Sequence, residues 1–170
     1  MTRRTPQRST KRTLFISAEG YDEVGFLSWL KLKRGRRNNH LEITFDNAHG
    51  GSNPQIVEIA AKSQATVRVC FMDSDRYRTY PKEREESEGK ASAAGVEILY
   101  SEPSFENLLL GVLSIKPIRG KEKAQLRQAL KNKSPQDSNS YDSVLTVDML
   151  RAYGKTNNTI SRLLTLFELN

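Results

Sequence analysis

Short runs of apolar residues recur along the first 102 residues, some of them continuous and others alternating with polar residues. Each run has the length of a single β-strand, and polar or turn-forming residues follow it. Period-two alternation is typical of a strand with one buried face. The predicted strands are "TLFIS" (13–17), "LEITF" (41–45), "TVRVCFMDSD" (66–75) and "VEILYSE" (96–102).

Between and after these strands, apolar residues recur at the three- and four-residue spacing of an amphipathic helix. Val24, Leu27 and Leu30 mark the first such segment, and Asn53 followed by Pro54 is a favourable start for the second. Residues 76–90 are densely charged and predict an exposed loop leading into a polar helix. The first two helices are predicted at 22–33 and 54–64. Further helices are predicted at 103–115, 122–133, 143–154 and 157–169.

Alternating strands and helices predict βαβ units, and therefore an α/β fold with a mostly parallel four-stranded sheet flanked by helices. Because crossovers between parallel strands are right-handed, the carboxyl ends of the strands share one edge, where ligands bind in Rossmann-like folds. We expect residues 13–115 to form this domain and residues 1–12 to form a flexible basic arm. We expect residues 116–170, with a polar linker at 134–140, to form a helical extension that packs on the same domain.

Three acidic residues follow the ends of two predicted strands. Glu19 comes after the first strand, and Asp73 and Asp75 end the third, in "VRVCFMDSDRY". Residues two apart on a strand point to the same face, so the two aspartates would repel each other unless something neutralised them. Hard oxygen ligands suit Mg²⁺ or Mn²⁺, and the sheet topology can bring Glu19 into the same crevice. The alternative is a polar strand end followed by a solvated turn.

The charge of the chain favours a polyanionic partner. Its 170 residues carry a formal net charge of +7 with a pI of about 9.6. Basic residues gather in three stretches, at 1–12, 31–37 and 116–133, although each alone could be ordinary surface. We expect nucleic acid to be the partner. The candidate nucleic-acid-binding residues are Arg34, Arg36, Arg37, Arg76 and Arg78.

The single cysteine, Cys70, lies in an apolar run and cannot form an internal disulfide, which favours a reducing compartment and a core position for this residue. No apolar run approaches the roughly 20 residues needed to cross a bilayer. We therefore expect a cytoplasmic protein that does not enter the membrane.

A strand that ends in Glu-Gly and a later strand that ends in Asp-x-Asp, on a compact parallel sheet, resemble the TOPRIM domain of topoisomerases, primases and OLD-type nucleases. The chain resembles more closely the RloB family of phage-resistance proteins over roughly residues 13–115. The matching segments are "LFISAEGYDEVGFLSWL" (14–30), "GGSNPQIVEIA" (50–60), "VCFMDSDRY" (69–77) and "ILYSEPSFENLLLGVL" (98–113).

The resemblance implies a metal-dependent nuclease that cleaves phosphodiester bonds of DNA or RNA as the effector of an anti-phage, abortive-infection system. It implies that Glu19, Asp73 and Asp75 are catalytic and hold Mg²⁺ (or Mn²⁺). Glu106 is a candidate fourth ligand, and its alternative role is that of a helix first-turn acid. The resemblance also implies an ABC- or AAA-type ATPase partner, and a homo-oligomer is possible.

Two departures from the TOPRIM pattern keep a second hypothesis open. Tyr77 stands where these enzymes often have a third acid, and Asp22 and Glu23 stand in place of a Lys-Thr-Glu sequence. The chain could therefore be a non-catalytic module that binds nucleic acid or an ATPase and regulates it. A haloacid-dehalogenase phosphatase is excluded because its Asp-x-Asp pair follows the first strand and precedes Gly-Thr.

The loop "HGGSN" (49–53) lies at the same predicted edge of the sheet. His49 and the backbone N–H groups ahead of the helix start could contact a phosphate. Ordinary loop polarity is the alternative, because a short Gly-Gly loop has no specific chemistry by itself.

Overall fold

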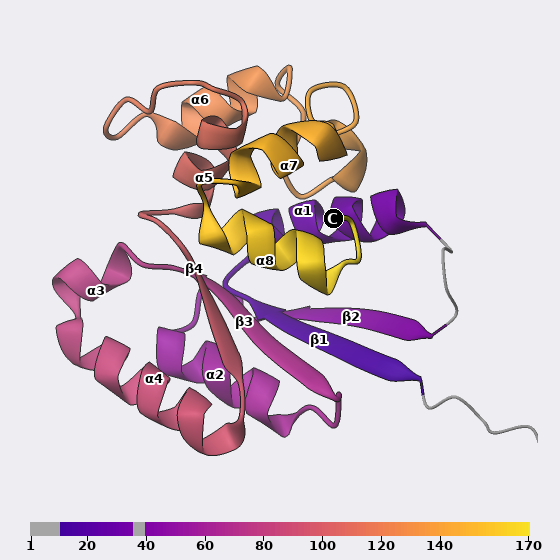
Figure 1. The fold of residues 1–170 in the computed structure, drawn as a ribbon. Coiled ribbons are helices and arrows are strands. Elements are labelled where there is room, and N and C mark those ends of the chain that lie inside the picture. The colour runs from indigo at the N-terminus through magenta and orange to yellow at the C-terminus, as the bar shows by residue number, and fades with distance from the viewer. Residues whose placement is uncertain (1–10, 36–39) are drawn as a thin grey trace, which may run out of the picture.

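Four parallel strands form one sheet in the computed structural model, which describes residues 11–35 and 40–170. The strand order is β2-β1-β3-β4, and each neighbouring pair is parallel (Figure 1). The α/β fold predicted from the sequence is therefore confirmed. The strands are β1 (Arg12–Ala18), β2 (Leu41–Asn47), β3 (Val67–Asp73) and β4 (Glu97–Ser101).

Helices follow each strand and continue through the C-terminal third of the chain. The α-helices are α1 (Tyr21–Arg34), α2 (Asn53–Lys62), α3 (Arg76–Thr79), α4 (Pro81–Ala94), α5 (Phe105–Val112), α6 (Glu122–Ala129), α7 (Val147–Gly154) and α8 (Asn158–Leu166). A short 3-10 helix, η1, covers Ser138–Ser140. None of the helices in the described ranges is both long and apolar enough to span a bilayer.

The helices lie on both faces of the sheet (Figure 1). Alternate residues of β3 divide between the two faces: Val69 and Phe71 enter one hydrophobic cluster, whereas Cys70 and Met72 enter the other. Residues of α2 and α4 complete the smaller cluster, and residues of α1, α5 and the C-terminal helices complete the larger one. Cys70 is fully buried, so its predicted core position is confirmed.

The C-terminal segment packs against α1 through the residues predicted as a polar linker. Gly25 of α1 lies so close to this segment that a Cβ atom there would overlap the backbone oxygen of Pro135. The hydroxyl of the buried Tyr141 donates to the same oxygen at 2.7 Å, and Trp29 Nε1 donates to Asp142 at 2.9 Å. The segment around 134–142 is therefore a packed connection.

Element boundaries differ from the prediction at functionally relevant points. The third strand ends at Asp73, and the chain then turns, so Asp75 is not part of a continued strand. The charged segment 76–90 forms two helices, α3 and α4, because Pro81 begins a new helix. Arg12 begins β1, opposite Leu41, so the predicted basic arm of residues 1–12 is wrong at this position. Residues 1–10 lie outside the described residues.

Candidate metal-binding site

Glu19 and Asp73 lie side by side at the carboxyl edge of the sheet. Strands β1 and β3 are parallel neighbours in which Ala18 pairs with Phe71, so the residues that follow these strands meet. The N–H of Glu19 donates to the oxygen of Phe71 at 3.2 Å, and Glu19 Oε2 accepts from the N–H of Asp73 at 3.1 Å. The expected convergence of these two acids is therefore present.

The first turn of α5 orients the Asp73 carboxylate. Its Oδ1 accepts from the N–H of Phe105 at 2.7 Å, one of the amides that a helix start leaves without an intrahelical partner. The pKa of Asp73 is raised from 3.8 to about 9, mainly because burial disfavours the charged form, and then because Glu19 and Glu23 lie close by. Without a cation, Asp73 keeps its proton at neutral pH.

Two further buried acids, Glu23 and Glu106, lie in the first turns of α1 and α5. Glu23 Oε2 accepts from the N–H of Gly20 at 3.1 Å, which fixes this carboxylate beside the end of β1. Burial, followed by the charge of Glu19, raises the pKa of Glu23 to about 7. Burial likewise raises the pKa of Glu19, and the hydrogen bond from Asp73 opposes this effect.

The turn after β3 presents Asp75 to solvent and directs Tyr77 into the protein. The N–H of Asp75 donates to the oxygen of Pro103 at 2.9 Å, and the Asp75 side chain is exposed. Tyr77 is buried, and its hydroxyl lies 3.1 Å from that of Tyr100. The position at which TOPRIM enzymes often have a third acid therefore faces away from the carboxylates, and Glu106 lies in the site instead.

Two adjoining cavities, of about 390 Å³ and 260 Å³, open over these acids. Both are lined by Glu19, Asp73, Glu106 and Lys123. The larger cavity is also lined by two arginines and by Asp75, whereas the smaller one is also lined by Tyr21 and Glu23. The arginines are Arg78 of α3 and Arg119, which precedes α6.

The donor set suits a hard divalent cation. Burial and neighbouring carboxylates raise the pKa values of Asp73, Glu23 and Glu19. Lys123 Nζ lies 3.8 Å from Glu106 Oε1, but the lysine side chain is 87% exposed, so it neutralises this buried cluster only weakly. In the described parts of the chain, no three His, Cys, Asp or Glu side chains already stand in ligand geometry. Holding an ion would therefore require carboxylate side chains to rotate toward it.

The structure separates the five arginines that the sequence suggested for nucleic-acid binding. Arg78 lines the larger cavity, as a phosphate-binding side chain would. Arg76 binds Glu83 through two hydrogen bonds, at 2.6 and 3.0 Å. The prediction for Arg34 needs correction, because this side chain is buried and its Nη2 donates to Glu168 at 2.7 Å. Arg36 and Arg37 lie outside the described residues.

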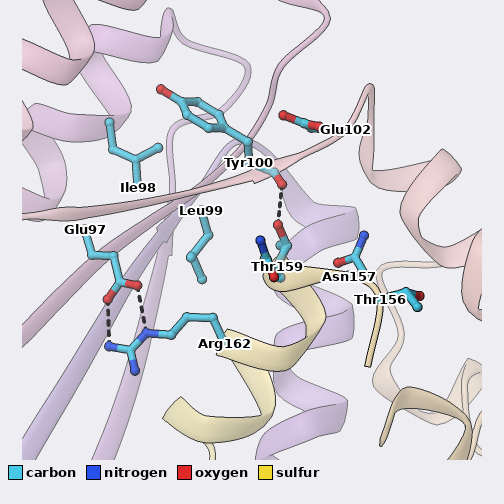
Figure 2. A pocket seen from close by; sticks show the side chains of 10 residues that line it. Glu97, Ile98, Leu99, Tyr100, Glu102, Thr156, Asn157, Thr159 and Arg162 are labelled. Carbon is cyan, nitrogen blue, oxygen red and sulfur yellow. Dashed lines mark hydrogen bonds and ion pairs between the residues drawn. The ribbon is translucent and has the colours of Figure 1, made fainter. Parts of the chain in front are cut away.

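Another cavity, of about 500 Å³, lies away from these acids, between β4 and the start of α8. Figure 2 shows two contacts across it: Arg162 donates to Glu97 at 2.8 Å, and the Thr159 hydroxyl donates to the backbone oxygen of Tyr100 at 2.7 Å. These contacts fasten α8 to the edge strand. The cavity therefore belongs to the packing of the C-terminal helices.

Three residues of the site were not among the predicted ligands or nucleic-acid contacts. In the sequence, Glu23 departs from the TOPRIM pattern, and its position four residues after Glu19 is the one signal that could have identified it. Arg119 and Lys123 lie in the basic stretch 116–133, but only the fold shows that this part of the extension reaches the acids.

Comparisons of the chain with models of known protein families, with curated proteins and with solved structures give no match.

Proposed function

We propose that this protein is a metal-dependent nuclease whose site is the carboxylate cluster at the carboxyl edge of the sheet. The observation that carries the proposal is the placement of Glu19 and Asp73 against each other, with the buried Glu106 beside them. Carboxylates that lie together in a cavity repel one another when they are ionised, and Asp73 therefore keeps a proton until a cation replaces it; this arrangement in a cavity open to water favours a ligand role.

The residues of the site supply different parts of the chemistry. Glu19, Asp73, Asp75 and Glu106 would hold Mg²⁺ or Mn²⁺, which supplies charge neutralisation and an activated water for phosphodiester hydrolysis. Because a ligand carboxyl must lose its proton, the raised pKa of Asp73 makes ion binding strengthen as the pH rises. Arg78, Arg119 and Lys123 line the same cavity and would hold the phosphate.

The biological setting follows from the motif resemblance alone. A nuclease of this kind would act as the effector of an anti-phage system with an ABC- or AAA-type ATPase partner, in the cytoplasm. We keep a non-catalytic regulatory module as the second candidate because the buried Tyr77 leaves this chain without the third acid of the TOPRIM pattern.

A cleavage assay tests the proposal. Plasmid, single-stranded DNA and tRNA are incubated with the purified protein and Mg²⁺ or Mn²⁺, in parallel with Asp73→Asn. The matched control is Glu42→Gln, which removes an exposed carboxylate near the start of β2, away from the site. We expect the control to cleave like the parent and Asp73→Asn to be inactive. Equal cleavage by the parent and by Asp73→Asn would indicate that a contaminating nuclease cleaves the substrates, and it would favour the regulatory module.

A further inference from the structure

An exposed aromatic side chain borders the acidic site. Tyr21, the first residue of α1, is 53% exposed and lines the smaller cavity together with Glu19 and Asp73. Its ring meets that of His49 edge to face, with centroids 5.5 Å apart and an angle of 65°. An apolar ring half open to water beside a charged cavity offers a flat surface to a ligand.

The loop that carries His49 is anchored to the same backbone as Glu19. The N–H of Gly50 donates to the oxygen of Glu19 at 3.1 Å, and the N–H of Ala48 donates to the oxygen of Ala18 at 2.9 Å. His49 has a positive φ of 50°, and its N–H donates to Asn47 Oδ1 at 3.0 Å. The backbone that carries His49 is therefore held next to the backbone of Glu19, which places the ring pair beside the carboxylates.

The aromatic and the cationic side chains line different parts of the site. Tyr21 lines the smaller cavity, whereas Arg78 and Arg119 line the larger one. Lys123, Glu19 and Asp73 line both, so the two cavities adjoin at the acids. A nucleotide chain has the matching division, because its phosphates are anionic and its bases are flat.

We propose that the site binds single-stranded nucleic acid, with one base stacked on Tyr21 and the adjoining phosphates on the cationic side. In a duplex the bases stack on each other and offer only their edges, so a rim side chain can stack only on an unpaired base. This inference rests on the proposed function for the chemical class of the ligand. It adds that the substrate is single-stranded and that Tyr21 is a positioning residue.

Binding of a fluorescent 12-nucleotide poly-dT strand and of a 12-base-pair duplex, measured by anisotropy in EDTA, tests the inference without cleavage. Tyr21→Ala should bind the single strand roughly ten-fold to a hundred-fold more weakly, the loss expected for one stacked base. Tyr21→Phe keeps the ring and should bind like the parent. The matched control is Tyr80→Ala, which removes a tyrosine that is 50% exposed and lines neither cavity over the acids.

Several outcomes would overturn the inference: no single-strand binding by the parent, unchanged binding by Tyr21→Ala, or an equal loss in Tyr80→Ala. An equal loss for the duplex would also overturn it, because stacking on an unpaired base cannot act there. Failure of the proposed function would be seen in cleavage, not in binding. A parent that shows the predicted binding pattern but cleaves nothing with Mg²⁺ or Mn²⁺ would support single-strand recognition and refute the nuclease.

Discussion

Replacing Asp73 with asparagine should make the metal-free protein more stable at neutral pH. Burial, followed by the charges of Glu19 and Glu23, raises the pKa of Asp73 from 3.8 to about 9 in the folded protein. The folded state therefore holds this proton more tightly than the unfolded chain does. The stability that the bound proton contributes is complete below about pH 4 and is lost as the pH rises toward 9.

The size of the effect follows from these two pKa values. At pH 7 about three pH units separate the solution from the ordinary pKa, and each unit is worth about 1.4 kcal/mol, which gives about 4 kcal/mol for a carboxyl in a dry interior. Asp73 borders a cavity that water enters, which reduces the penalty, so we expect Asp73→Asn to gain about 2 kcal/mol. Asparagine keeps the Oδ1 acceptor for the N–H of Phe105.

Urea denaturation in EDTA at pH 4, 5.5, 7 and 8.5 measures the free energy of unfolding of the parent and Asp73→Asn. The gain should be near zero at pH 4 and should grow through pH 7. Glu42→Gln, the exposed control, should show no such trend. A gain at pH 7 that is no larger than at pH 4, or a loss of stability at pH 7, would refute the argument that Asp73 is buried among like charges.

Three further predictions concern other parts of the chain. Gly25→Ala should destabilise the fold by about 3 kcal/mol in urea denaturation, because the added Cβ meets the backbone oxygen of Pro135; unchanged stability would contradict this packing. Arg34→Met should lower the free energy of unfolding by about 2 kcal/mol, because it removes the buried partner of Glu168, and should leave the salt dependence of nucleic-acid binding unchanged. A weaker salt dependence in this variant would show instead that Arg34 contacts a phosphate. Deleting residues 1–10, which carry three arginines, should reduce the magnitude of the slope of log affinity against log salt concentration by about 2. An unchanged slope would mean that these residues do not contact the nucleic acid.

The sequence was sufficient to predict the sheet because its strands are short and separated by periodic helices. It also placed Glu19 beside Asp73, because neighbouring parallel strands bring their carboxyl ends together. This inference required only the strand ends and the handedness of the crossovers. It did not depend on side-chain detail.

Other features depend on contacts that the sequence pattern does not contain. Arg34 reads as part of a basic stretch, yet Glu168, which is 134 positions away, makes it a buried ion-pair partner. The direction of Tyr77 depends on where β3 ends and the chain turns. Lys123 reaches the acids because the segment near Pro135 packs on α1 and fixes the path of the extension. In each case a tertiary contact decides the role of a residue whose local sequence allows several roles.

A calorimetric titration with Mn²⁺ tests the claim that the carboxylate cluster holds a divalent cation most directly. Parent, Asp73→Asn and Glu42→Gln are titrated at pH 8, where more of the Asp73 population is ionised than at lower pH. We expect the parent and Glu42→Gln to bind Mn²⁺ alike and Asp73→Asn to bind at least about ten-fold more weakly, since it loses one ligand charge. Equal Mn²⁺ affinity in the parent and Asp73→Asn would contradict the account.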